Sequence, residues 1–388
     1  MTPDRRRPIE QATSVYRRDW KHSDRAIIPP MTYAVDEDIR VAATLDAGFY
    51  RDEAAYAATR ERVFARTWQW IGDLGDVAVI ESFAPRELLP GLVDEPLLLV
   101  RGADGEVTCM SNVCTHRGNI LVHAPGRGSH IRCGYHSRRF DLAGRMTFMP
   151  EFEDARNFPS RDDDLAHIPF DSWAGHGFVA LDPAAPLMDF VGDMAVQLQA
   201  MPVGEFRHDC ARDREYRLDA HWALYVENYL EGLHVPFVHA RLAQSVDCSS
   251  YEDRLFPLST LQIALAKPGE AAFEPAADSD RRVAALYWWI FPNLMLNFYP
   301  WGLSLNLVQP EGIDRTRVTF RSYVRDAALL DRGAGCGLDR VEAEDEAVVQ
   351  AVQRGVRSRF YRRGRYSPSR ERGVHHFHRL LARFLSED

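Results

Sequence analysis

The chain has 388 residues, of which 46% are hydrophobic and 27% charged, and its net charge is −9. This composition is typical of a soluble globular protein and excludes a disordered chain or a small disulfide scaffold. The negative charge disfavours a nucleic-acid-binding surface, and no apolar run is long enough to predict a membrane span. Six cysteines without a visible export signal favour reduced thiols and a cytoplasmic location.

Three segments follow one another along the chain. Residues 1–45 are charged and irregular and predict an N-terminal arm. Residues 46–185 predict a leading helix over 52–67 and then short apolar runs separated by Gly and Pro, which is typical of an all-β domain. Residues 186–388 alternate between strand and helix patterns and predict an α+β domain.

The third segment contains seven predicted elements. Strands alternate polar and apolar residues, and helices show a spacing near 3.6. The expected strands cover 212–218, 284–290, 294–299, 303–308 and 317–324, and the expected helices cover 222–233 and 338–356.

Two short segments in the all-β region each combine a cysteine with a histidine. Cys114 and His116 form a C-x-H pair, and 16 residues later Cys133 and His136 form a C-x-x-H pair. Two thiolates and two imidazoles brought by similar loops are a donor set for a metal ion or an iron–sulfur cluster. A chance grouping of four such residues within 23 positions is the weaker explanation.

A zinc ion and a [2Fe–2S] cluster both accept this donor set. Zinc pairs usually have two to four residues between ligands, and the single residue between Cys114 and His116 is short for that. A cluster with both cysteines on one iron and both histidines on the other fits better. Such a cluster relays electrons and does not transform a substrate, so an enzyme would need a second site.

A second group of candidate ligands begins about 100 residues later. Glu231 and His234 are three positions apart, which predicts a common helix face. His239 is five positions beyond His234 and would fall on another face of a continuous helix. Pro236 cannot donate a backbone hydrogen bond, so we expect the helix to kink or open there and bring the two histidines together.

Two histidines need a carboxylate to complete a site for non-haem Fe(II). Asp345 falls in the middle of the apolar stripe of the helix predicted over 338–356, whereas Glu342 lies at its edge and Glu344 and Glu346 point away. A carboxylate that faces a core is costly unless it is paired or bound to a metal. We therefore predict Asp345 as the third ligand, with a buried arginine partner as the alternative.

The motifs resemble those of one protein family over most of the chain. C-T-H-R-G…C-G-Y-H resembles the Rieske motif, and E-N-Y-L-E-G-L-H-V-P-F-V-H and E-D-E-A-V-V-Q resemble the iron segments of Rieske non-haem iron oxygenase α subunits. The resemblance implies that the two Cys–His pairs hold a [2Fe–2S] cluster. It implies that a mononuclear Fe(II) is bound by His234, His239 and Asp345.

The resemblance also assigns roles beside the iron. Glu231 matches the carboxylate that connects the iron site to a Rieske histidine of a neighbouring subunit, and Asn228 is a second candidate catalytic residue. One departure is visible at His221-Trp222-Ala223, where the family commonly has Asn-Trp-Lys. Any role of that Asn or Lys is therefore in doubt for this chain.

The family resemblance implies an architecture and a set of partners. We expect an all-β Rieske domain, a helix-grip catalytic domain with helices on an antiparallel sheet, and a head-to-tail homotrimer without a small β subunit. Electrons would come from NAD(P)H through a separate reductase or ferredoxin, because the chain has no nicotinamide or flavin fingerprint.

The expected activity is that of a terminal oxygenase that uses O₂ to hydroxylate or demethylate a small organic substrate. Resemblance to the choline-monooxygenase-like branch favours a quaternary ammonium compound. A ring-hydroxylating dioxygenase acting on an aromatic compound is the alternative. A Rieske electron carrier with a degenerate second domain is an alternative of another class, and it predicts loss of an iron ligand, whereas all three are retained.

Two further clusters stand out in the sequence. Seven aromatic residues predict a slot for a ring or a cage for a quaternary ammonium group, or else ordinary sheet core. They are Tyr287, Trp288, Trp289, Phe291, Phe298, Tyr299 and Trp301. Eight arginines predict a solvated helix face, a trimer contact or a docking patch for an acidic reductase. They are Arg354, Arg357, Arg359, Arg362, Arg363, Arg365, Arg370 and Arg372.

Overall fold

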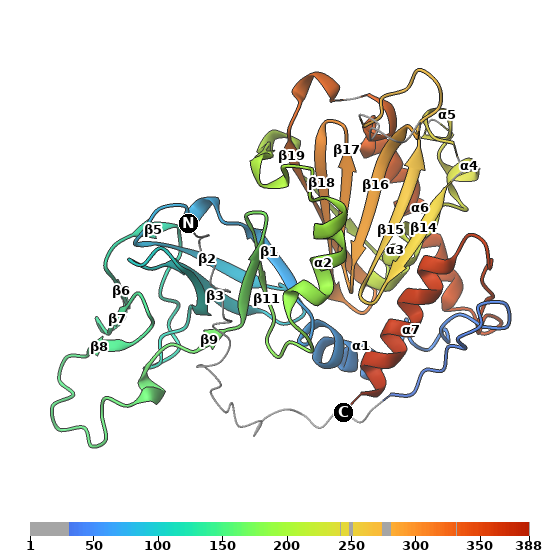
Figure 1. The fold of residues 1–388 in the computed structure, drawn as a ribbon. Helices are drawn as coiled ribbons and strands as arrows, with labels where there is room; N and C mark the ends of the chain where they lie inside the picture. Colours follow the sequence, from blue (N-terminus) through green and yellow to red (C-terminus); the bar gives the residue numbers. More distant parts are fainter. Residues whose placement is uncertain (1–30, 241, 248–250, 274–280, 331, 388) are drawn as a thin grey trace, which may run out of the picture.

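The chain folds into two lobes that lie side by side (Figure 1). The computed structural model describes residues 31–240, 242–247, 251–273, 281–330 and 332–387. Residues 1–30 of the predicted arm and Cys248 lie outside these ranges. Within them, no helix is both long enough and apolar enough to cross a membrane.

The first lobe is built of short strands after a leading helix, as the sequence predicts. Helix α1 (Glu53–Thr59) continues into a π-helical turn (Arg60–Phe64), so the predicted helix over 52–67 is confirmed but ends earlier. The strands are β1 (Gln69–Asp73), β2 (Ser82–Leu88), β3 (Glu95–Arg101), β4 (Val107–Ser111), β5 (Gly126–Arg127), β6 (His130–Arg132), β7 (Arg139–Asp141), β8 (Met146–Phe148), β9 (His167–Ile168), β10 (Phe170–Trp173) and β11 (His176–Val179). They form three antiparallel sheets in the orders β5-β2-β3-β4-β9, β6-β7-β8 and β1-β11-β10.

The second lobe is centred on an eight-stranded antiparallel sheet. Its path is β12-β19-β18-β17-β16-β15-β14, and β13 pairs with β19 beside β12. The strands are β12 (Arg207–His208), β13 (Arg214–Leu218), β14 (Glu252–Phe256), β15 (Ser259–Leu265), β16 (Val283–Ile290), β17 (Leu294–Tyr299), β18 (Gly302–Gly312) and β19 (Arg315–Val324). All five predicted strands are present, which confirms the α+β, helix-grip class.

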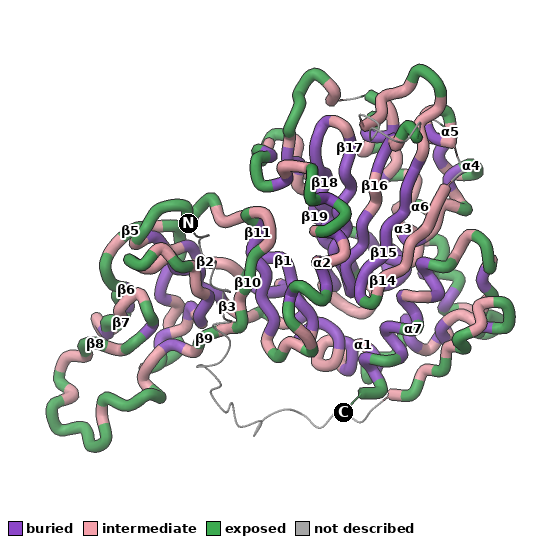
Figure 2. Tube along the Cα trace, in the orientation of Figure 1, coloured by how far each residue is buried: buried purple, intermediate pink, exposed green. Residues whose placement is uncertain are grey.

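Helices cover this sheet so that its central strands are buried on both faces (Figure 2). Helix α2 contacts β15 and β16, while α3 contacts β18 and α6. In Figure 1, α2 lies in front of the sheet and α6 behind it. The helices are α2 (Leu187–Gln197), α3 (Trp222–Tyr229), α4 (Val235–Val238), α5 (Leu242–Ser245), α6 (Leu338–Val356) and α7 (Arg372–Ser386).

The strand registers place a polar row on one face of the central sheet. Gln262 pairs with Tyr287, Tyr287 with Asn297, and Asn297 with Ser304, so the four residues align across β15 to β18. Residues aligned in this way share a face, because side chains alternate along each strand. All four line a cavity together with residues of α3 and α6, so this face looks toward those helices.

The predicted aromatic cluster divides between core and cavity. Trp288, Trp289 and Phe298 are completely buried in the main hydrophobic core, as ordinary sheet core requires. Tyr287, a member of the polar row, and Tyr299 instead line the cavity. The cage hypothesis therefore applies to the tyrosines and not to the whole run.

A buried polar cluster fixes the half of α3 that leads to the candidate iron ligands. The Tyr50 hydroxyl donates to Glu227 Oε1 at 2.6 Å, and His378 Nε2 of α7 lies 3.1 Å from the same oxygen. Helix α7 packs closely here, because a Cβ at Gly373 would collide with the carbonyl oxygen of Leu230. The end of α3 is thus held from two sides.

The arginine-rich segment mainly contacts residues 40–46, near the start of the described chain. Most of it lies between α6 and α7, so a helix face is the wrong structure for it. Arg362 and Arg363 both pair with Asp46, at 3.1 and 3.4 Å. Arg365 donates to the backbone carbonyl of Ala42 at 2.9 Å. These contacts hold residues 40–46 against the catalytic lobe and leave the trimer and docking hypotheses as predictions.

Candidate metal centres

The two Cys–His loops of the first lobe have matching backbone hydrogen bonds. Cys114 N donates to Asn119 O and Cys133 N to Arg138 O, both at 2.8 Å. The carbonyls of the two cysteines accept from Gly118 N and Ser137 N, at 3.0 and 3.1 Å. Both residues have positive φ, 69° and 62°, so each loop turns back at the same point. The loops therefore present their cysteines in equivalent geometry.

The two histidines of these loops lie against each other. His116 Nδ1 and His136 Nδ1 are 3.2 Å apart, and the ring centroids are 4.7 Å apart. Burial, with a further contribution from the positive charge that His136 can carry, lowers the pKa of His116 below its ordinary value. Two neutral imidazoles with adjacent nitrogens are the donors that a Rieske cluster needs on one iron.

The thiol of Cys133 is surrounded by N–H donors. Tyr135 N and Asn119 Nδ2 lie 3.5 and 3.6 Å from its sulfur. Burial acts to raise the pKa of this thiol, but the hydrogen bonds from the Tyr135 and His136 amides lower it below its ordinary value. Hydrogen bonds to sulfur stabilise the thiolate form that ligates iron and tune the cluster potential.

Arg138 ties the two loops together. It is almost fully buried, its Nη1 donates to Thr115 Oγ1 of the first loop at 2.7 Å, and its Nη2 pairs with Asp163 at 2.8 Å. Its guanidinium also lies 5.4 Å from the ring centre of Phe158. A buried arginine needs such partners, and here they fix the spacing between the two halves of the candidate cluster site.

The second candidate site begins where α3 ends. Helix α3 stops at Tyr229, and Glu231 and His234 lie in a bent segment, so the predicted common helix face is wrong. The predicted kink at Pro236 is wrong as well. Pro236 stands in the first turn of the separate short helix α4, where its missing N–H costs nothing. His234 and His239 flank α4 at its two ends, and this brings them together.

His234, His239 and Asp345 meet as the sequence predicts. One ligand atom from each lies within 4.8 Å of the others. His239 Nε2 is 3.0 Å from Asp345 Oδ1, and His234 Nε2 is 3.6 Å from the same oxygen. Although burial acts in the opposite direction, Asp345 and Glu344 raise the pKa of His239. A raised pKa means that the two carboxylates favour the protonated His239, and a divalent cation would take the place of that proton. The three residues therefore fit a mononuclear metal.

Each histidine is held on its other nitrogen by a glutamate. Glu231 Oε1 lies 2.5 Å from His234 Nδ1, and Glu344 Oε2 lies 2.8 Å from His239 Nδ1. Carboxylates that accept from Nδ1–H fix the ring orientation and leave Nε2 free for a metal. The prediction that Glu344 points away is therefore wrong. The sequence offered one signal for it, its position next to Asp345.

The buried face of α6 differs from the predicted stripe. Val352 is 43% exposed, whereas Glu342 is only 5% exposed and accepts from the Tyr225 hydroxyl at 2.7 Å. Glu342 is thus a central residue of this face and not an edge residue. Asn228 Nδ2 donates to Asp345 Oδ1 at 2.7 Å, which fixes the third ligand from α3.

His221 has a structural place at the start of α3. Its side chain accepts from Ala223 N at 3.2 Å and caps the helix. Burial lowers its pKa to about 3, so the ring is neutral. It does not line the cavity beside the three ligands. The departure from the family pattern at this position therefore changes a helix cap and not a ligand.

A cavity opens beside the three ligands. Its walls include the rings of Tyr229, Tyr251, Tyr287 and Tyr299, and its floor is the polar row of the sheet. The Tyr229 hydroxyl donates to Asn297 Oδ1 at 2.7 Å, and Tyr287 meets Tyr299 edge to face at 6.0 Å. This arrangement provides several aromatic faces that share one space with the ligand carboxylate.

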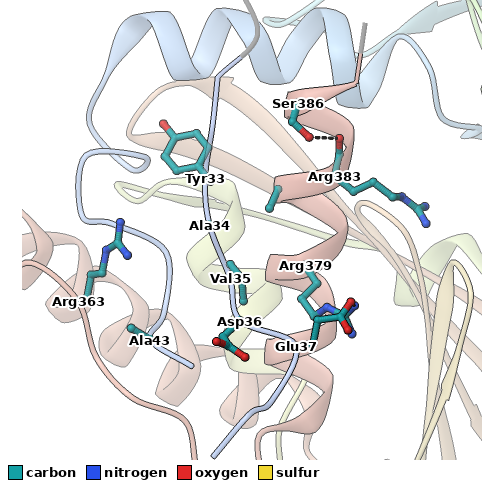
Figure 3. Close-up of a pocket in the computed structure, with 11 residues that line it drawn as sticks. Tyr33, Ala34, Val35, Asp36, Glu37, Ala43, Arg363, Arg379, Arg383 and Ser386 are labelled. Carbon is teal, nitrogen blue, oxygen red and sulfur yellow. Dashed lines mark hydrogen bonds and ion pairs between the residues drawn. The ribbon is translucent and has the colours of Figure 1, made fainter. Parts of the chain in front are cut away.

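A second hollow lies far from this site, between the N-terminal segment and α7 (Figure 3). Arg363, Arg379 and Arg383 extend along it (Figure 3), and Arg379 pairs with Glu37 at 2.6 Å. None of the predicted ligand residues lines it. It is a surface groove between two joined segments and adds nothing to the metal chemistry.

Comparison with protein families matches both lobes. Residues 71–159 match the Rieske [2Fe–2S] domain, and residues 206–387 match the catalytic domain of ring hydroxylating α subunits. The oxygenase subunit of carnitine monooxygenase from Escherichia coli K12 is 30% identical over 362 residues, which cover 89% of this chain and 94% of the relative. The chain belongs to the Rieske oxygenase family.

Other relatives and solved structures agree. Choline monooxygenase of Arabidopsis thaliana is 30% identical and covers 88% of this chain and 82% of its own length. A quaternary ammonium Rieske monooxygenase in complex with L-carnitine has a TM-score of 0.73 at 24% identity, covering 89% of this chain and 97% of that one. Naphthalene 1,2-dioxygenase of Rhodococcus shares the fold with a TM-score of 0.69 at 19% identity, covering 88% of this chain and 94% of that one.

Family membership makes the chain an oxidoreductase and decides between the two cofactors for the first site. A Rieske oxygenase carries a [2Fe–2S] cluster and a mononuclear iron, so the zinc alternative falls. The electron-carrier alternative is wrong as well, because residues 206–387 match the catalytic domain and retain all three candidate iron ligands.

The burial of Glu342 predicts a pH-dependent stability. Burial, which outweighs the hydrogen bond from Tyr225, raises the pKa of Glu342 from 4.5 to about 8. Between these values the folded state keeps the proton and the unfolded state does not, so stability falls as pH rises. In wild-type protein whose mononuclear iron has been removed by chelation, the free energy of unfolding should fall between pH 5 and 8 with a slope that approaches about 1.4 kcal/mol per pH unit. The variant Glu342→Gln should lack this pH dependence.

Urea unfolding at a series of pH values measures this effect. The exposed Glu153→Gln is the control for loss of one negative surface charge. A stability difference between wild type and Glu342→Gln that stays constant from pH 5 to 8 would contradict the assignment.

Proposed function

We propose that the chain is the terminal oxygenase of a two-component system that acts on a small quaternary ammonium compound. The observation that carries this proposal is the tyrosine-lined cavity beside the three ligand residues. Aromatic faces attract quaternary ammonium groups through cation–π interactions. Relatives named carnitine monooxygenase and choline monooxygenase support the same class of substrate.

The geometry supports the ligand assignments that we propose. We assign Cys114, His116, Cys133 and His136 to the cluster, and His234, His239 and Asp345 to the mononuclear iron. When bound, the cluster relays single electrons and the iron activates O₂ for insertion of oxygen into the substrate.

The protein's own residues prepare the iron site. Glu231 and Glu344 hold the Nδ1–H of the two histidines and keep both Nε2 atoms aimed at Asp345. Asn228 occupies one lone pair of the Asp345 oxygen and restricts its rotation. Glu231 Oε2 also accepts hydrogen bonds from the backbone N–H groups of Leu233 and His234, and these bonds hold the carboxylate in place. We propose that Glu231 and Asn228 are positioning residues of the catalytic centre.

The cavity suits a cation better than a flat apolar ring. Its floor carries the amides of Gln262 and Asn297 and the hydroxyl of Ser304. Each of these groups makes one hydrogen bond within the protein, and an apolar ring would leave their remaining donor and acceptor capacity unused, which is costly. A methylated ammonium group lies against tyrosine faces and leaves the remaining polar part of the substrate to the floor.

The positions of the two sites support a homotrimer. The β6–β7 end, which carries the second cluster loop, and α4 lie at opposite ends of the molecule (Figure 1). Apolar side chains are exposed at both ends, with Tyr135 61% exposed beside the cluster loops and Phe237 82% exposed on α4. A head-to-tail ring would place one chain's cluster beside the next chain's iron and cover both patches.

The remaining assignments complete the proposal. We place the protein in the cytoplasm, where a separate NAD(P)H-dependent reductase or ferredoxin supplies its electrons. We propose residues 46–185 as the Rieske domain and residues 186–388 as the catalytic domain. Arg359 is exposed, and Arg362 is exposed although it pairs with Asp46, so we propose that both can face an acidic electron donor.

Oxygen uptake with NADH, a generic reductase and a panel of compounds tests the function. Trimethylammonium compounds should stimulate uptake, and formaldehyde release should reveal any demethylation. Asp345→Ala should lose mononuclear iron and turnover but keep the visible spectrum of the cluster, because only the ligand triad is broken. Glu346→Gln on the same helix is the matched control. Stimulation by aromatic acids alone would contradict the proposal.

Mixing two inactive variants tests the trimer. His136→Ala should lose the cluster and Asp345→Ala the mononuclear iron, so each is inactive alone. If electrons cross between chains, random co-assembly in equal amounts restores activity at about one quarter of the interfaces. Activity of co-expressed chains is the readout, and lysates mixed after assembly are the control. No activity after co-expression would contradict transfer between subunits.

A further inference from the structure

The cavity beside the candidate iron ligands is lined with acidic groups, and its described lining offers no arginine or lysine. Glu231, Glu342 and Asp345 reach it. Among the described residues that line the cavity, none is Arg or Lys. Its other polar groups are neutral amides and hydroxyls, apart from the two histidines of the ligand triad. Electrostatically, the space is therefore suited to a positive group.

Two of the three acidic groups are engaged elsewhere. Asp345 faces both Nε2 atoms, and Glu231 accepts from His234 Nδ1. With neutral histidines, these two carboxylates balance the two charges of a ferrous ion. Glu342 is the third acidic group of the cavity: burial keeps a proton on it while the cavity is empty, and a cation bound beside it would take the place of that proton.

Glu342 has one carboxyl oxygen without a hydrogen-bond partner among the described residues. Its Oε2 accepts from the Tyr225 hydroxyl at 2.7 Å, while its Oε1 is buried and has no hydrogen-bond partner among the described residues. A buried, unpaired carboxyl oxygen is costly and is found where a ligand or an ion satisfies it. The side chain lines the same cavity as the four tyrosines, so a cation bound against their rings lies in its field.

We propose that the cavity selects a quaternary ammonium cation that carries no carboxylate, and that Glu342 is the specificity-determining residue that faces its positive charge. The inference rests on the proposed function and deepens it. A choline-like cation carries a single positive charge, which the carboxyl group of Glu342 can face. A zwitterion such as carnitine brings a second carboxylate into a space whose described lining offers it only neutral donors.

The energetic argument favours the same choice. Two carboxylates in one buried space repel each other, and burying an anion without a cationic partner is strongly unfavourable. The amides of the floor can accept a hydroxyl group without such a cost. The substrate class is therefore a trimethylammonium compound with a neutral polar end.

Calorimetric binding to the anaerobic holoenzyme tests the inference without turnover. The probes are choline, its uncharged isostere 3,3-dimethylbutan-1-ol, and L-carnitine. Wild type should bind choline at least about tenfold more tightly than the isostere, the value of one charge-assisted contact. It should also bind choline more tightly than L-carnitine. Glu342→Gln should lose most of the preference for choline over the isostere while its affinity for the isostere changes less than about twofold.

Glu346→Gln is the matched control. Glu346 lies one turn further on α6, also has a buried unpartnered oxygen, and does not line the cavity, so this variant should keep the preference for choline. An equal loss of affinity for choline and the isostere in Glu342→Gln would show a merely structural role and overturn the assignment.

The outcomes separate the inference from the proposed function. Tighter binding of L-carnitine than of choline by wild type would overturn the inference and leave a quaternary ammonium oxygenase intact. Binding of no quaternary ammonium compound would overturn both.

Discussion

The candidate iron site depends on two carboxylate–imidazole pairs. Glu231 and Glu344 bind the Nδ1 atoms of His234 and His239, and this contact turns both Nε2 atoms toward Asp345. Without these partners each ring could rotate or exchange its tautomer, and the three donors would not converge. The rest of the catalytic lobe can be understood as the support that keeps the two glutamates and the aspartate in place.

That support comes from elements distant in the sequence. The end of α3 is held by Glu227, which contacts Tyr50 near the N-terminus and His378 near the C-terminus. Helix α6 brings Asp345, Glu344 and Glu342 to the same place from more than 100 residues further along the chain. The sheet contributes a polar floor and tyrosine walls, so ligand geometry and substrate space share the same framework.

Much of this could be predicted from the sequence, because strands and ligand motifs are local patterns. Strand β17 and helix α6 have the predicted bounds, and Asp345 is where its pattern placed it. Contacts between distant segments could not be predicted in that way. Glu344 was misjudged because its partner His239 lies at the end of α4, far away in the sequence, and Glu342 was misplaced because polar residues occupy the buried face of α6. The bend between α3 and α4 was not predicted either, because residue spacing alone does not show where a helix ends.

The central claim is that one chain holds two separate iron centres with different donors. Mössbauer spectroscopy of wild-type protein loaded with ⁵⁷Fe tests this claim most directly. After anaerobic reduction it should show the two unequal irons of a Rieske cluster, one with thiolate and one with imidazole ligands, and a third, equally intense signal of high-spin ferrous iron without sulfur ligands. A spectrum with the cluster signals alone, in protein that has been given excess ferrous iron, would contradict the account.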